Sequence, residues 1–83
     1  MSRRVYLYAF GPYYIDTVID AYIDDRKSID AGGEMVSEIA YAEYDSRQTR
    51  KQLATEGYDA AYVSVAVAFD IDNNFNVSNV VEL

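Results

Sequence analysis

The residues with the clearest chemical spacing are three aspartates, Asp16, Asp20 and Asp24, which stand four positions apart. On a helix this interval places their carboxylates along one face, about 6 Å apart. Such a row roughly imitates the phosphates of a nucleic-acid strand and suits a protein surface rich in Lys and Arg. Together with Asp25, these residues form our predicted partner-binding site. The alternative that the sequence leaves open is a solvated helix face.

Catalytic and metal-binding chemistry finds little support in the side chains. The chain has no histidine and no cysteine, which removes the commonest general base, thiolate ligands and any disulfide. Asp70 and Asp72 could form an acid–base pair, but strand-end carboxylates are commonly solvated. Residues 70–74, DIDNN, alternate oxygen ligands, yet Phe75 and Val81 stand where an EF-hand loop needs glycine and glutamate. We therefore expect a plain hairpin turn, no enzyme, no metal and no cofactor.

Aromatic residues give the N-terminal segment a second possible function. Residues 5–11, VYLYAFG, resemble strand one of RNA-recognition motifs, and residues 61–69, AYVSVAVAF, can be compared with their third strand. Those domains stack bases on exposed aromatic rings beside basic side chains. The glycine–aromatic pattern of their third strand is absent here, and fourteen acids against seven bases give a net charge of −7. We therefore expect no direct nucleic-acid binding.

Length and composition predict one folded domain, residues 1–83. Hydrophobic residues make up 51% of the chain and charged residues 25%, which is typical of globular proteins and not of disordered ones. No apolar run reaches the length needed to span a membrane. Gly11-Pro12 interrupts the N-terminal apolar stretch before it could serve as a signal sequence. We expect a cytoplasmic protein, in the host cytoplasm if the protein is viral, with no membrane partner.

The predicted fold is organised around residues 61–71, AYVSVAVAFDI. Every odd position from Ala61 to Ile71 is apolar, and this period of two predicts a strand with one buried face. Val65 and Val67 should be fully buried at its centre. The other predicted elements are a strand at 3–10, a helix at 12–28, a strand at 34–44, a helix at 46–56 and a strand at 75–83.

The segment at 34–44 also fits a helix. We choose the strand because Gly32-Gly33 precedes it and a helix-capping signal at Asp45 follows it. The resulting order, β-α-β-α-β-β, predicts an α+β fold. We expect a two-layer sandwich, in which a four-stranded sheet carries two helices on one face.

Two helices on one face leave the other face of the sheet uncovered. That face would carry Tyr6, Tyr8 and Tyr62, three of the nine tyrosines. Tyrosine suits interfaces because its ring is apolar while its hydroxyl stays hydrated. We therefore predict that these three residues form the interface of a homodimer.

These inferences favour a small acidic protein without enzymatic activity. We expect it to dock on the basic, nucleic-acid-binding surface of a larger protein and to inhibit that protein. In size, charge and lack of cysteine it resembles phage-encoded inhibitors of host defence, including anti-CRISPR proteins. The alternatives are a structural homo-oligomer built through the tyrosine-rich face and an RNA-recognition-like module.

Overall fold

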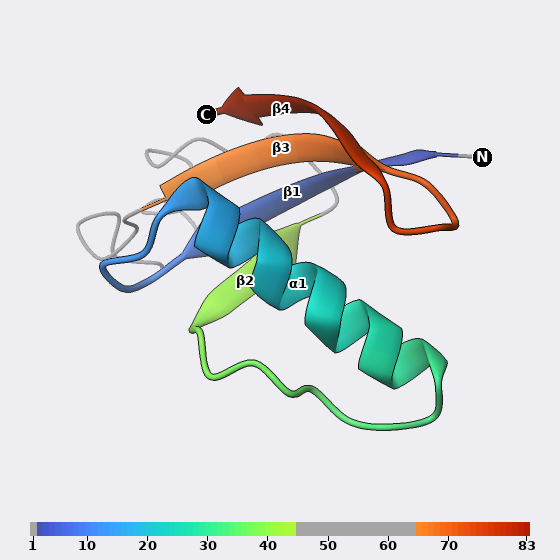
Figure 1. Ribbon diagram of the computed structural model, residues 1–83. Helices are drawn as coiled ribbons and strands as arrows, with labels where there is room; N and C mark the ends of the chain where they lie inside the picture. The colour runs from blue at the N-terminus through green and yellow to red at the C-terminus, as the bar shows by residue number, and fades with distance from the viewer. Residues whose placement is uncertain (1, 45–64) are drawn as a thin grey trace.

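The computed structural model describes residues 2–44 and 65–83. Four strands and one helix lie in these two ranges, and Figure 1 shows the helix crossing one face of a single sheet. An α+β fold is therefore confirmed, whereas the second predicted helix, at 46–56, lies outside the described residues. In chain order the elements are β1 (Arg3–Ala9), α1 (Ile15–Asp30), β2 (Tyr41–Tyr44), β3 (Val65–Ile71) and β4 (Val77–Glu82).

The sheet has the strand order β2-β1-β3-β4, and every neighbouring pair is antiparallel. β1 pairs with β3 along its whole length, from Arg3 opposite Ile71 to Ala9 opposite Val65. Two strands that are far apart in the sequence therefore form the centre of the sheet. β2 is a short edge strand, whose four residues pair with Tyr6–Ala9 of β1.

The main core lies between α1 and the sheet. The predicted strand is confirmed over residues 65–71, and Val65 and Val67 are buried as predicted, at 6% and 0% exposed, whereas the single buried face is wrong because Ala66 and Ala68 are buried too. The odd-numbered side chains of β1 and β3 share one face because directly paired residues of antiparallel strands point the same way. The buried members of this core are Val5, Leu7, Ala9, Val18, Ile19, Tyr22, Val65, Val67, Phe69 and Ile71.

The helix begins three residues later than the sequence predicted. Pro12 was expected to open it, because proline is favoured in a first helical turn. Instead Tyr14 is still extended, with φ −91° and ψ 156°. The Tyr13 N–H donates to the Gly11 carbonyl oxygen at 2.8 Å, so Pro12 lies at the centre of a tight turn between β1 and α1.

The C-terminal end of α1 is set by the predicted pair of glycines. The helix runs to Asp30, two residues beyond the expected end at Ser28. Gly32 has φ 89°, a left-handed conformation that glycine adopts without steric cost. Its N–H donates to the Ile29 carbonyl oxygen at 3.0 Å, and the Gly33 N–H donates to the Ser28 carbonyl oxygen at 2.8 Å. These bonds satisfy carbonyls that the last turn would otherwise leave unpaired.

The strand predicted over residues 34–44 is too long. Only β2 at its C-terminal end is a strand, and residues 34–40 have no regular secondary structure. The N–H groups of Val36 and Ser37 both donate to Asp25 Oδ1, at 2.8 and 2.7 Å. Because the side chain of α1 takes these donors, they are not available to a strand ladder.

The second face of the sheet is buried, so the prediction that nothing in the chain covers it is wrong. Tyr6 is 8% and Tyr8 is 0% exposed, and Ala66 and Ala68 are also buried. The register places Tyr6 opposite Ala68 and Tyr8 opposite Ala66. Each ring therefore stands beside a small methyl group, which leaves it room to pack down on the sheet. Both faces of the two central strands are buried within one chain.

Candidate functional site

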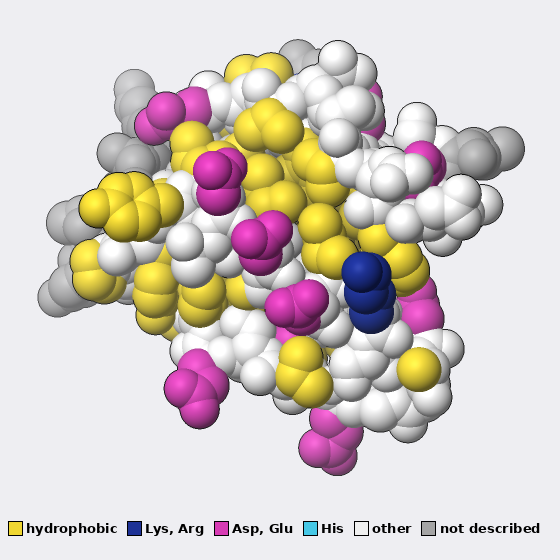
Figure 2. Space-filling model, in the orientation of Figure 1, with side chains coloured by type: hydrophobic (Ala, Val, Ile, Leu, Met, Phe, Trp, Pro, Cys, Tyr) yellow, Lys and Arg dark blue, Asp and Glu magenta, His cyan; other side chains and the backbone are white. Residues whose placement is uncertain are grey.

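The acidic row, Asp16, Asp20 and Asp24, lies on the exposed side of α1. The helical interval directs these carboxylates away from the sheet, on the side opposite the buried Val18 and Tyr22. Figure 2 shows acidic side chains following one another along the helix. Within the described residues, no carboxylate of the acidic row takes part in an ion pair. Its three negative charges therefore have no counter-ion in residues 2–44 and 65–83.

A shallow hollow of about 300 Å³ lies beside the acidic row. Asp20 and Asp24 line it from α1, and Val36 and Ile39 line it from the segment that follows the helix. Val36 is 62% exposed, so an apolar surface lies directly next to two carboxylates. This combination matches a lysine or arginine side chain, whose methylene stem packs on apolar groups while its charged end stays near anions.

Asp25 does not share the exposed surface of the acidic row, so its assignment to the predicted partner-binding site is wrong. The side chain is 1% exposed. Its Oδ1 accepts the N–H groups of Val36 and Ser37, and its Oδ2 accepts the Tyr41 hydroxyl at 2.5 Å. Burial by itself would raise the pKa of Asp25, but these donors outweigh that effect and hold the pKa below its ordinary value. The carboxylate fixes residues 34–41 against α1.

A second polar network attaches α1 to the sheet. Arg3 donates to Glu43 Oε1 at 3.0 Å and to the Tyr22 hydroxyl at 2.5 Å, and that hydroxyl donates to the same Glu43 oxygen at 3.1 Å. Burial, together with the nearby Glu43 carboxylate, raises the pKa of Tyr22. The Tyr22 ring also makes edge-to-face contacts with Tyr41 and Phe69, at centroid distances of 6.2 and 5.9 Å. The direction in which α1 presents the acidic row is therefore fixed.

The two carboxylates considered for catalysis or calcium, Asp70 and Asp72, are both engaged in the β3–β4 hairpin. Asp70 accepts from Arg4 at 3.1 Å and from the Asn79 amide at 2.7 Å. Asp72 accepts the N–H groups of Asn74 and Asn76 and also the side-chain amide of Asn76. Hydrogen bonds to these donors lower the pKa of both carboxyl groups. In residues 2–44 and 65–83, no three acidic side chains gather as a metal site would require.

The predicted interface residues that the structure describes are buried. Tyr6 and Tyr8 lie on the far side of the sheet from α1 and are closed off within the chain, while Tyr62 is outside the described residues. Rings buried in this way are not presented to a second copy. Stacking of RNA bases also needs exposed rings, so β1 lacks the feature that would make it similar to an RNA-recognition strand.

Comparison with protein-family models, curated proteins and solved structures gave no match to this chain. In the part of the chain that the structure describes, no helix is long and apolar enough to cross a membrane.

Sequence analysis missed two structural roles at this site: the buried carboxylate of Asp25 and the polar network around Tyr22. The first could have been recognised from the residue spacing. Val18, Tyr22 and Asp25 follow the four- and three-residue spacing of a buried helix face, so the third position should have been read as buried. The link between Arg3, Tyr22 and Glu43 had no such signal. It depends on the strand register, which brings β1 and β2 together beneath α1.

Proposed function

We propose that this is a binding protein without enzymatic activity, which docks its acidic row on a basic, nucleic-acid-binding surface of a larger protein and blocks that surface. The observation that carries the proposal is an exposed row of three carboxylates, unpaired within the described residues, on a helix held in one orientation by buried contacts. Preorganised anions bind more tightly because little conformational entropy is lost on docking.

The spacing and the total charge both support this proposal. Consecutive carboxylates of the acidic row stand four residues apart, which corresponds to about 6 Å along the helix. A surface that normally holds phosphates with Lys and Arg can hold carboxylates by the same charge-assisted hydrogen bonds. The net charge of −7 would also attract a basic surface from a distance and raise the association rate.

The shallow hollow beside the row supplies specificity. One basic side chain of the partner would place its head between Asp20 and Asp24 and its stem against Val36. Charges alone would bind any cationic surface, whereas an apolar contact next to them favours a side chain of fitting length.

The test replaces the whole acidic row by asparagine and measures capture of proteins from the lysate of the native host. We expect the partner, identified by mass spectrometry at low salt, to be lost, with about a tenfold lower association rate for the purified pair. Binding of the wild type should weaken at 0.5 M salt, because exposed charges are screened over about 8–10 Å at ordinary ionic strength. The fold should remain intact, since removing two like-charge pairs relieves about 0.2–0.5 kcal/mol each.

A matched control separates the acidic row from bulk charge. The control variant also removes three exposed acidic charges, but at positions outside the row, and should bind the partner like the wild type. If the row variant still captures the same protein with unchanged affinity, the aspartates are only a solvated face. The control substitutions are Glu34→Gln, Glu38→Gln and Glu82→Gln.

A further inference from the structure

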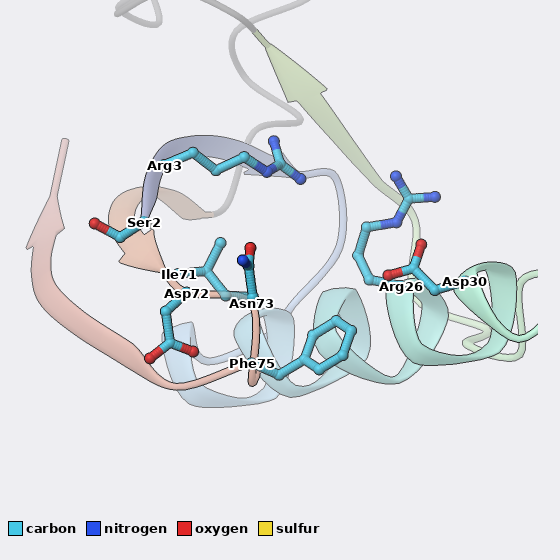
Figure 3. Close-up of a pocket in the computed structure, with 8 residues that line it drawn as sticks. All are labelled: Ser2, Arg3, Arg26, Asp30, Ile71, Asp72, Asn73 and Phe75. Atoms are coloured by element: carbon cyan, nitrogen blue, oxygen red, sulfur yellow. The ribbon is translucent and has the colours of Figure 1, made fainter.

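A hollow of about 710 Å³ lies on a different part of the surface from the acidic row. It is formed by the start of β1, the last turns of α1 and the turn between β3 and β4 (Figure 3). This volume is in the range of small-molecule sites. The lining residues used below are Arg3, Arg26, Asp30, Ile71, Asn73 and Phe75.

The floor of the hollow is apolar and held in place by an unusual backbone conformation. Ile71 is 5% exposed. Phe75 has φ 63°, which is rare for a bulky residue, and its N–H donates to the Asp72 carbonyl oxygen at 3.1 Å. Lys27 lies over its ring, 5.6 Å from the centroid. Conformations of this kind persist only where the surroundings hold them, and they are concentrated at binding sites.

Two guanidinium groups reach the hollow from different elements. Figure 3 shows Arg3 extending from β1 and Arg26 from α1, with the Asn73 amide pointing toward the Arg3 side of the hollow. Arg3 is positioned by Glu43 and Tyr22, and it retains further N–H groups for a ligand. Arg26 is half-buried and, within the described residues, makes no ion pair or hydrogen bond. The positive charge of Arg26 helps to lower the pKa of the nearby Asp25, but its guanidinium N–H groups remain available for charge-assisted hydrogen bonds to an anion.

Asp30 lies at the edge of the hollow, beside Arg26 in Figure 3, and its negative charge would repel a bound anion. Asp72 points away from the space, and its carboxylate is taken up by the turn. The arrangement thus offers two guanidiniums, one amide and an aromatic floor, against two competing carboxylates: Asp30 at the edge and Glu43, which is paired with Arg3 at 3.0 Å. We propose that the hollow binds a small organic carboxylate whose flat apolar body packs on Phe75 and Ile71 while its carboxylate lies between Arg3 and Arg26.

The test is a titration of the ¹⁵N-labelled protein with benzoate, followed by NMR. We expect saturable shifts at the backbone amides of Asn73 and Phe75 and at the guanidinium N–H groups of Arg3 and Arg26. Benzamide, which has the same shape without the charge, should bind at least about tenfold more weakly. N-acetylphenylalanine tests whether the carboxylate belongs to the end of a peptide, and tighter binding than benzoate would identify that source.

Variants with opposite expected effects make the proposal falsifiable. Arg26→Gln should weaken benzoate binding about tenfold, and Asp30→Asn should strengthen it about threefold by removing one competing carboxylate. Asp20→Asn changes the net charge equally but lies outside the hollow, so it should have no effect. Equal strengthening by both aspartate variants, equal affinity for benzamide and benzoate, or the absence of saturable shifts would each overturn the proposal. The two aspartate variants keep the test valid even if Arg26→Gln does not fold.

Discussion

Replacing the buried carboxylate of Asp25 tests whether it holds residues 34–41 against α1. Asp25→Ala leaves three donors without an acceptor: the N–H groups of Val36 and Ser37 and the Tyr41 hydroxyl. A buried donor that loses its partner costs about 1–3 kcal/mol. Val36 is exposed, so water can replace the acceptor for its N–H. Counting the other two donors gives a loss of about 2–6 kcal/mol, out of a stability of roughly 4–12 kcal/mol for a domain of this length.

The loss can be measured as a shift of the urea unfolding midpoint, followed by far-UV circular dichroism. With a denaturant slope of about 1 kcal/mol per molar urea, the midpoint should fall by about 2 M or more. The control is Asp24→Ala, one residue away but exposed, which should change stability by less than about 0.5 kcal/mol. Similar midpoints for the two variants would refute the structural role of Asp25.

The same residue predicts a pH dependence with a definite sign. The pKa of Asp25 is lowered in the folded protein, so folding favours its ionised form. Its contribution to stability is therefore present above the ordinary carboxyl pKa of about 4 and is lost as the pH falls through the lower, folded value. Asp25→Asn removes this titration, and its stability should fall less steeply below pH 4 than that of the wild type. Parallel acid unfolding curves would contradict this reasoning.

Two further predictions concern the sheet. Val67→Ala removes methyl groups from a fully buried side chain and should cost about 1–3 kcal/mol, whereas Val81→Ala, at a position 47% exposed, should cost less than about 1 kcal/mol in the same urea experiment. Tyr8→Ala should cost about 3–5 kcal/mol without changing the oligomeric state measured by light scattering, because the ring is buried inside the chain. A stable Tyr8→Ala protein that dissociates from an oligomer would restore the interface hypothesis.

The elements that local pattern defines were predictable, and those that depend on pairing partners were not. The alternation ending at Ile71 and the stripe containing Val18 and Tyr22 identified β3 and α1 directly, because each face repeats with the period of its own structure. The predicted helix start at Pro12 was wrong, because the fixed φ of proline suits a tight turn as well as the first turn of a helix. The burial of Tyr8 was not predicted, because the number of helices does not determine how a tyrosine ring packs on the sheet. That packing depends on the register of β1 with β3, which sequence pattern does not give.

Two adjacent aspartates show what charge pattern alone cannot predict. Asp24 and Asp25 are the same residue type in adjacent positions, yet one is exposed and the other is 1% exposed. One step along a helix rotates a side chain by about 100°, which is enough to move it from the solvent to the core side. Charge alone suggested that the two act together, whereas the position relative to the apolar stripe separates them.

The central pairing of β1 with β3 has a consequence for how the protein is made. Leu7 and Val67 are partners in the sheet but stand 60 positions apart (67 − 7). At a synthesis rate of about 5–20 residues per second, a ribosome needs roughly 3–12 s to bridge that gap. During this interval β1 carries the apolar side chains of Val5 and Leu7 with no β3 to pair with. The nascent chain is therefore most exposed to aggregation, and to capture by chaperones, before its third strand has been translated.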